Sequence, residues 1–411
     1  MCFILGVFLI ALVLGAGCTQ TPAVSGSDEI RIGVVASMTG AASTTGKDIW
    51  QSAELAAEEI NAKGGVPVKE LGRSLPIRLV QGDDESTREG GMKAVMKLIT
   101  QDKVHVLVGG YSSAVVSAHQ AIVADNKVPY IISGASSSAV SRRTDLDTSY
   151  MFFHRPNTDD SGEASVQFMM DVFRPAVYAK FGLPDDRKLR VAVIYQDSPF
   201  GKGQLDAVKA VVTAKSLPIE IVAEEPFKMS ESDFRTVLTS VKGKNPDIIY
   251  AVTFLNELTP MTQQARRDVG LSTMIMAIEN NDDPDYYSSV GAYGDGMVME
   301  SRFSPYAVPA GSTEAATKKF LADFDRKYGG FAGMMGAATY ESVYVAAAAI
   351  EEAGSLDRAK IRDALATIEV PQMLEIMKNG TISFSPDFRE SKFELYVVQL
   401  AMDPVSGEPR P

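Results

Sequence analysis

The sequence predicts an α/β protein built from two similar lobes that enclose a ligand cleft. Short β-branched apolar runs alternate with helical patterns, which is typical of parallel sheets covered by helices on both faces. The alternation stops near residues 150–155 and then starts again, with no sequence repeat of the first half. At 411 residues the chain is long enough for two domains, or for two lobes of one.

Composition excludes several classes of function. The net charge of −12 leaves no basic stripe that could neutralise phosphates, so we expect no nucleic-acid partner. The only two cysteines, Cys2 and Cys18, lie in the first 18 residues, so the rest of the chain has no thiolate metal site and no disulfide. His105, His119 and His154 do not have the spacing of a zinc motif. We therefore predict no metal and no cofactor.

The N-terminus has the pattern of an export signal. Residues 1–17 are almost wholly apolar, which is short for a membrane span and suits a signal-peptide core. The run ends in Leu-Gly-Ala-Gly before Cys18, which resembles the lipobox of secreted lipoproteins. We expect a signal peptide over 1–18, lipid attachment at Cys18, and a flexible Thr-, Ser-, Gly- and Pro-containing tether over 19–29. An uncleaved anchor is the alternative, and it places the body in the same compartment, outside the cytoplasmic membrane.

In the first half, four strands are each followed by a helical pattern. The expected strands are 30–35, 75–80, 104–109 and 128–133. Helices are expected over 48–61 and 90–100, and after the loops that end the third and fourth strands. This order predicts a parallel sheet.

The second half repeats the alternation, and the last hundred residues add long helices. The expected strands are 189–195, 219–223, 247–253, 273–278, 381–384 and 393–400. The expected helices are 168–180, 203–214, 232–242, 260–269, 313–327, 337–353 and 357–366. Two α/β units of similar size enclose a cleft, where small ligands commonly bind.

Two loops of small residues mark the candidate site. Gly109, Gly110, Ser112 and Ser113 follow the third strand, and 134–138 (Gly-Ala-Ser-Ser-Ser) follow the fourth. Ligands of open α/β sheets bind beyond the carboxyl ends of the strands, where helix N-termini present free N–H groups. The loops therefore predict a cradle for a small anionic group such as a carboxylate. That the serines are ordinary helix N-caps is the open alternative.

Four sequence blocks resemble the periplasmic branched-chain amino-acid binding proteins, which are substrate-binding subunits of ABC importers. The blocks are 30–66 with its Ile-Asn-x-Lys-Gly-Gly signature at 60–65, RLVQGDDEST at 78–87, VLVGGYSSA at 106–114, and AVIYQDSPFGKG at 192–203. The resemblance implies the type I periplasmic binding protein fold, with two Rossmann-like lobes joined by a three-segment hinge near 152–155, 302–306 and 370–381. The N-terminal lobe would comprise 30–152 plus 307–370, and the C-terminal lobe 153–306 plus 371–411. An ABC permease would be the protein partner.

The resemblance also implies an amino-acid clamp. Ser113 matches the family's carboxylate-binding serine, and Ser136 matches the second hydroxyl partner of the carboxylate. The carbonyl of Gly134 and the carboxylate of Glu279 match the groups that receive the ligand ammonium. We expect Ser113 and Ser136 each to stand at a helix N-terminus, where the helix dipole favours an anion.

A second set of matched positions concerns the ligand side chain. Phe200 and Phe254 match family aromatics, while Thr45 stands near a lost first-loop aromatic. Ser112 is expected beside the ligand, and Ser86 and Ser112 stand where many members carry a disulfide. These matches predict a protein that captures a small aliphatic or otherwise apolar amino acid by lobe closure.

Other readings of the sequence remain. The same fold could bind amides, urea or aromatic acids, or could serve as a sensor domain. A serine hydrolase is the remote alternative, because residues 110–114 approach the G-x-S-x-G nucleophile elbow. That fold needs a histidine near the end of the chain, and no histidine follows His154, so we expect no enzyme activity.

Overall fold

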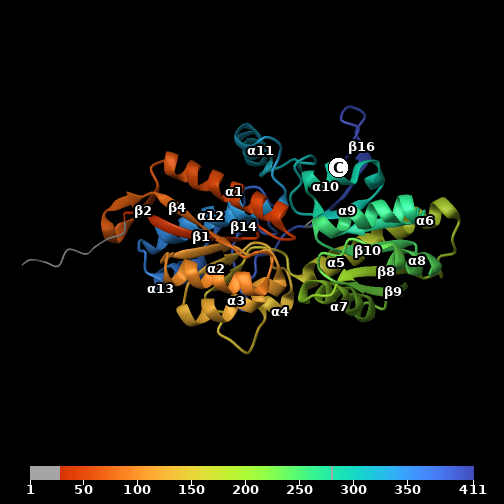
Figure 1. Cartoon of the computed structure of the whole chain (residues 1–411), viewed down its shortest axis with the longest axis horizontal. Helices are drawn as coiled ribbons and strands as arrows, with labels where there is room; N and C mark the ends of the chain where they lie inside the picture. The colour runs from red at the N-terminus through yellow and green to blue at the C-terminus, as the bar shows by residue number, and fades with distance from the viewer. Residues whose placement is uncertain (1–27, 279–280) are drawn as a thin grey trace, which may run out of the picture.

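The computed structural model describes residues 28–278 and 281–411. It contains two sheets, and Figure 1 shows each sheet with its own helices as one of two lobes lying side by side. The predicted α/β fold class and two-lobe architecture are confirmed. Within the described ranges, no helix combines the length and apolar character needed to cross a membrane.

The first sheet has five parallel strands in the order β4-β1-β5-β6-β7. They are β1 (Ile30–Ala36), β4 (Ile77–Asp83), β5 (Val106–Gly109), β6 (Tyr130–Ile132) and β7 (Met151–Phe153). Successive side chains point to opposite faces. Val34 packs in the core on the side of α1 (Ser43–Ala62) and α12 (Met334–Ala353), whereas Val35 packs on the side of α2 (Arg88–Thr100) and α3 (Ser113–Asn126). Helices on both faces explain why the strands are almost continuously apolar.

The second sheet has six strands in the order β15-β12-β11-β10-β8-β9, and only β15 runs antiparallel. They are β8 (Leu189–Gln196), β9 (Ile219–Phe227), β10 (Ile248–Val252), β11 (Met274–Ala277), β12 (Val298–Ser301) and β15 (Tyr396–Gln399). The lobe's helices are α5 (Thr158–Phe168), α6 (Arg174–Phe181), α7 (Pro199–Ala214), α8 (Arg235–Gly243), α9 (Leu255–Gln263) and α10 (Pro284–Val290). Two π-helical turns, η2 (Met169–Phe173) and η3 (Gln264–Asp268), extend α5 and α9.

Segments from the far end of the sequence complete both lobes. The helices α11 (Glu314–Tyr328), α12 and α13 (Arg358–Thr367) lie with the first sheet, on the left of Figure 1. The chain then returns to the second sheet at β15. The lobes are thus joined three times, between β7 and α5, between β12 and α11, and between α13 and β15.

Several local expectations were wrong. The pattern after 128–133 gives only the four-residue α4 (Ser138–Ser141), and β7 adds a fifth strand that we did not predict. A small hairpin, β2 (Val66–Val68) with β3 (Arg73–Leu75), also precedes β4. Helix α1 begins five residues earlier than expected, at Ser43. Gly46 permits this early start, because a Cβ there would lie 2.0 Å from the Ser37 carbonyl oxygen.

Candidate functional site

The first predicted loop follows β5 and leads directly into α3. Gly109 and Gly110 have φ values of +97° and +81°, a region that favours glycine. A Cβ at Gly110 would also lie 2.1 Å from the hydroxyl oxygen of Tyr130, so the loop needs glycine for space as well. This turn places Ser112 at the N-cap of α3 and Ser113 at its first residue, and both side chains are buried.

The second predicted loop lies against the first. The Ser113 Oγ accepts a hydrogen bond from the backbone N–H of Ser137 at 3.2 Å. A Cβ at Gly134 would lie 2.8 Å from the Cα of Tyr111, so the absence of a side chain lets the loops approach. Ser136 is buried, and its carbonyl accepts the N–H of Thr158 at the start of α5. The structure therefore brings the two loops together, as the sequence indicated.

One expectation about these loops was wrong. Ser136 is not at a helix N-terminus, because α4 begins two residues later and is a single turn of four residues. Only Ser113 stands at the start of a long helix, the 14-residue α3. Dipole support for an anion is therefore available from the first loop alone.

Aromatic rings from both lobes meet next to the loops. Phe200 on α7 stacks with Phe254, the N-cap residue of α9, with 5.6 Å between ring centroids. The ring of Tyr111, from the first lobe, lies 4.6 Å from the ring of Phe254. Sequence reasoning missed Tyr111, although it stands between the Gly and Ser residues of the first loop. Because Tyr111 belongs to the first lobe and the two phenylalanines to the second, both lobes contribute to this group of aromatic rings.

A buried carboxylate positions one of these rings. Glu257 accepts the backbone N–H of Phe254 at 2.9 Å and that of Ser230 at 2.8 Å, and Gln196 donates to both of its oxygens. Burial raises the pKa of Glu257, and the two backbone N–H bonds and the Gln196 bond oppose that rise. Glu257 therefore holds the loop after β10 in place, and with it the ring of Phe254.

Of the remaining predicted positions, Thr45 and Ser86 lie within the described residues. Thr45 is buried in the first turn of α1. It stands near the position at which family members carry an aromatic residue in the first loop. Ser86 receives the N–H of Ala42 at 3.0 Å and donates to the carbonyl of Thr39 at 2.9 Å, so it fixes the loop before α1. Glu279 and Cys18 lie outside the described residues.

The lobes touch directly at this place. The Ser137 Oγ donates to the carbonyl oxygen of Pro199, at the start of α7, at 3.1 Å. Ser138 and Thr158 are joined by a hydroxyl pair at 3.1 Å and by a bond from the Ser138 N–H at 3.2 Å. The candidate site therefore lies at the contact between the lobes.

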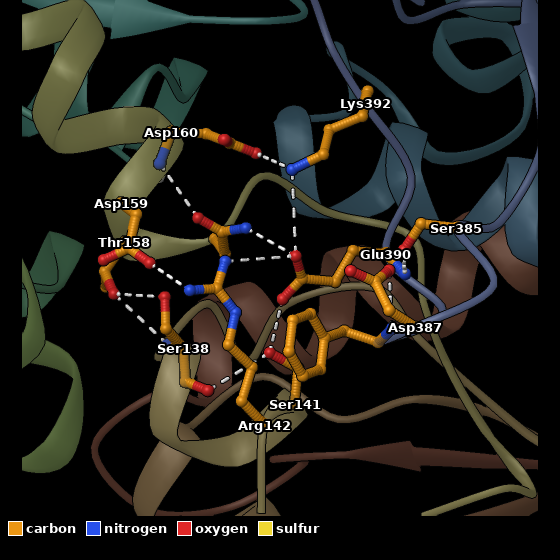
Figure 2. Close-up of polar contacts among 12 residues, drawn as sticks. Ser138, Ser141, Arg142, Thr158, Asp159, Asp160, Ser385, Asp387, Glu390 and Lys392 are labelled. Atoms are coloured by element: carbon orange, nitrogen blue, oxygen red, sulfur yellow. Dashed lines mark hydrogen bonds and ion pairs between the residues drawn. The ribbon is translucent and has the colours of Figure 1, made fainter.

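Polar side chains tie the hinge segments together near α4. Glu390 accepts hydrogen bonds from Ser141 at 2.5 Å and Asn157 at 2.7 Å, and it lies 3.4 Å from Arg142 (Figure 2). Lys392, on the same segment, pairs with Asp160 of α5 at 2.8 Å. Because Phe153 also forms a β-bridge with Glu390, the first and third crossing segments run side by side.

A second, fully buried hinge cluster joins all three crossings. His154, Arg302 and Glu375 come from the first, second and third crossing segments, and Glu341 comes from α12. His154 Nε2 lies 2.8 Å from Glu341 and 3.3 Å from Glu375, and Arg302 lies 3.0 Å from Glu375. Burial would raise the pKa of Glu341, but His154 and the N–H groups of Leu374 and Glu375 bring it below its ordinary value.

This cluster is also the one group of described residues with metal-ligand spacing. The ligand atoms of His154, Glu341 and Glu375 lie within 4.8 Å of one another. Each of them already has a protein partner, however, and Arg302 supplies positive charge inside the cluster. We therefore assign the cluster to the hinge rather than to a metal ion.

The described residues do not support the hydrolase alternative. Both ring nitrogens of His119, on α3, are buried without a hydrogen-bond partner, and burial lowers the pKa of His119 to about 3. The His105 ring nitrogen accepts the N–H of Arg31, and His154 belongs to the hinge cluster. Ser113 therefore has no histidine beside it to act as a general base.

Comparison with known proteins identifies the family. A family model described as periplasmic binding protein matches residues 29–404. The chain belongs to the periplasmic binding protein family. The resemblance seen in the sequence blocks, to the branched-chain amino-acid type, is confirmed. Membership of this periplasmic binding protein family implies a place outside the cytoplasmic membrane.

Three known proteins are similar to this periplasmic binding protein over most of their length. An amino acid binding protein of Pseudomonas aeruginosa is 26% identical over 363 residues, covering 87% of this chain and 88% of the relative. The branched-chain amino acid transporter substrate binding protein of Streptococcus pneumoniae, solved with isoleucine, has a TM-score of 0.76 at 24% identity, covering 93% of this chain and 98% of that one. A solute binding protein of Rhodopseudomonas palustris, solved with 3,4-dihydroxybenzoic acid, has a TM-score of 0.74 at 23% identity, covering 93% and 95%.

Proposed function

We propose that this periplasmic binding protein captures a small apolar amino acid between its lobes and delivers it to the permease of an ABC importer. The observation that carries the proposal is the meeting of two Gly/Ser loops with aromatic rings at the contact between the lobes. Ser113 and the free N–H groups of α3 would hold the α-carboxylate. Gly134 and Glu279 would receive the ammonium, and Phe200 and Phe254 would cover the side chain.

Capture would work by closure of the two lobes. We assign residues 30–152 plus 307–370 to the first lobe and 153–306 plus 371–411 to the second. Three crossing segments permit a rotation between such lobes, with the buried hinge cluster as its fixed centre. The Ser137–Pro199 bond and the Tyr111–Phe254 contact join the two lobes, and both contacts support the proposal that the described arrangement is the closed form.

An aromatic acid is the second candidate ligand. Tyr111, Phe200 and Phe254 offer three rings, and flat ligands pack well against such surfaces. The Rhodopseudomonas palustris relative was solved with an aromatic acid. The two candidates differ in one group, since benzoates lack the ammonium that Glu279 would bind.

A thermal-shift screen separates these candidates. We expect one of the twenty amino acids to raise the melting temperature, because a ligand at a hundred times its Kd stabilises the folded state by about 2.7 kcal/mol. Benzoate, 3,4-dihydroxybenzoate, urea and small amides are screened beside them. If only ligands without an ammonium group shift the melting temperature, the amino-acid proposal is wrong, and an aromatic acid or an amide becomes the proposed ligand.

We also propose that a lipid on Cys18 anchors the protein to the membrane. The apolar core before small residues and a cysteine supports this, as does the polar tether that follows. Mass spectrometry of the membrane fraction is expected to show a mature chain that begins at diacylglyceryl-modified Cys18. A Cys18→Ser variant is the control, and it should lose the lipid mass. A mature protein that begins further along the chain would contradict the anchor.

A further inference from the structure

Two carboxylates, one from each lobe, meet at the N-terminus of α12. Asp48, on α1 of the first lobe, accepts the backbone N–H of Gly333 at 3.3 Å and that of Gly336 at 2.7 Å. Gly333 is the N-cap residue of the 20-residue α12, so Asp48 caps a long helix. Asp283 comes from the second lobe, at the N-cap of α10.

Glycine lets both carboxylates reach the same point. A Cβ at Gly333 would lie 2.2 Å from Asp283 Oδ2 and 3.4 Å from Asp48 Oδ2. At Gly336 a Cβ would lie 2.4 Å from Asp48 Oδ1. Neither glycine has a positive φ, so it is the space for the carboxylates that excludes a side chain. The two acids are therefore packed against one helix end from opposite lobes.

The groups nearest the pair are acidic or neutral, and one cation, Arg410 of β17 (Pro409–Arg410), lies beyond them, 4.4 Å from the centre of the Tyr306 ring. The first lobe contributes Asp48 and the N-terminus of α12. The second lobe contributes two further carboxylates and two phenols, those of Asp282, Asp285, Tyr287 and Tyr306. Burial raises the pKa of Asp283 to about 7, and the charges of Asp285 and Asp282 add to the rise. Burial and the charge of Asp283 also raise the pKa of Asp48, against the opposing N–H bonds of Gly336 and Gly333.

We propose that the lobes take up a proton as they close, held by the Asp48–Asp283 pair, so that ligand capture strengthens as the pH falls. In an open form Asp283 would leave the helix end, become hydrated and ionise at the ordinary pKa of about 3.9, while Asp48 would keep its bonds to Gly333 and Gly336 within the first lobe. When the lobes close, burial and mutual repulsion make it unfavourable for both carboxylates to stay ionised, so the pair holds a proton, as other close carboxylate pairs do. The inference rests on the lobe closure proposed above.

The sign of the effect follows from linkage. The closed form has the raised pKa, so it binds more protons than the open form between about pH 4 and pH 7. Closure is therefore most favourable at low pH and is weakened as the pH rises through about 7. For a closed-form pKa near 7, the closing equilibrium should be about tenfold more favourable at pH 6 than at pH 8. His105 and His119, with pKa values lowered by burial to about 4 and 3, stay neutral over this range.

The first test measures closure without a ligand. Spin labels are placed on exposed Ala121 of α3 and exposed Ala214 of α7, in the full-length chain in detergent with Cys2 and Cys18 replaced by Ser. Distances between the labels are measured by pulsed electron paramagnetic resonance. The ratio of the closed to the open population should be about ten times larger at pH 6 than at pH 8. Asp283→Asn should abolish the difference. Asp295→Asn, which removes an exposed carboxylate of the same lobe, should keep it.

The second test measures capture itself, with L-isoleucine as the probe in calorimetry at both pH values. We expect about tenfold tighter binding at pH 6 in the unmodified protein and equal binding in Asp283→Asn. Isoleucine binding that does not change with pH would overturn the proton coupling and leave the proposed function intact. Label distances that respond to pH without any isoleucine binding would support the coupling and count against isoleucine as the ligand. A pH response that survives in Asp283→Asn would also overturn the inference.

Discussion

Arg302→Met is expected to lower the free energy of unfolding by about 3–5 kcal/mol, because it removes the guanidinium that offsets the charge of the buried Glu375 carboxylate. Arg302 and Glu375 are fully buried and lie 3.0 Å apart. Arg302 also donates to the Ser133 carbonyl at 3.3 Å and packs over the ring of Phe393. Met fills most of the same space but supplies no charge, so the free-energy cost of burying the Glu375 carboxylate is no longer offset by the guanidinium. Urea unfolding of the ligand-free protein measures the change.

A surface pair supplies the matched control for this loss. Lys209 and Glu224 lie 2.8 Å apart, at a shorter distance than the buried pair, and both are exposed. Lys209→Met should cost about 1 kcal/mol or less, because water screens the exposed charges. Adding Glu375→Leu to Arg302→Met should recover part of the stability, since replacing a whole buried pair by apolar groups is often neutral. Equal losses in Arg302→Met and Lys209→Met would show that the hinge cluster does not stabilise the fold.

Local sequence pattern predicted most strands of the two sheets, because a strand buried on both faces needs apolar residues at almost every position, but it missed β7 and β12. The strands β1, β5 and β6 are of this kind. The pattern failed where tertiary contacts decide the conformation. The residues after β6 read as a helix, yet only Ser138–Ser141 form one, since the Ser136 carbonyl, the Ser137 hydroxyl and Ser138 are used in bonds to the second lobe.

The candidate site was predictable only in part. Gly and Ser residues after parallel strands indicate a binding edge wherever they occur, so the loop that contains Ser113 could be found without a structure. The hinge cluster could not, because His154, Arg302 and Glu375 are far apart in the sequence and belong to no local motif. Asp48 and Asp283 likewise lie on different lobes, and each reads alone as an ordinary surface acid. Their pairing depends on how the lobes meet.

Ser113→Ala is expected to weaken ligand binding by about 1.5–3 kcal/mol, or roughly tenfold to more than a hundredfold in Kd. The Ser113 oxygen accepts the N–H of Ser137, and this bond leaves the Ser113 O–H available to donate to a ligand carboxylate. A charged acceptor at the start of α3, in a buried place, makes that bond a strong one. Calorimetry with the amino acid that gives the largest thermal shift measures the loss.

The control for this prediction lies one turn further along the same helix. Ser117→Ala removes a half-buried hydroxyl from α3 and should leave the affinity unchanged, because Ser117 does not belong to either loop. Loss of the Ser113–Ser137 bond alone should cost about 1 kcal/mol of stability, so Ser113→Ala should still fold. The affinity loss should be equally large for a carboxylic acid that lacks the ammonium, whereas Glu279→Gln should weaken only the amino acid. If Ser113→Ala binds as tightly as Ser117→Ala, the carboxylate is held elsewhere and the two loops serve only to cap and connect the helices that follow them.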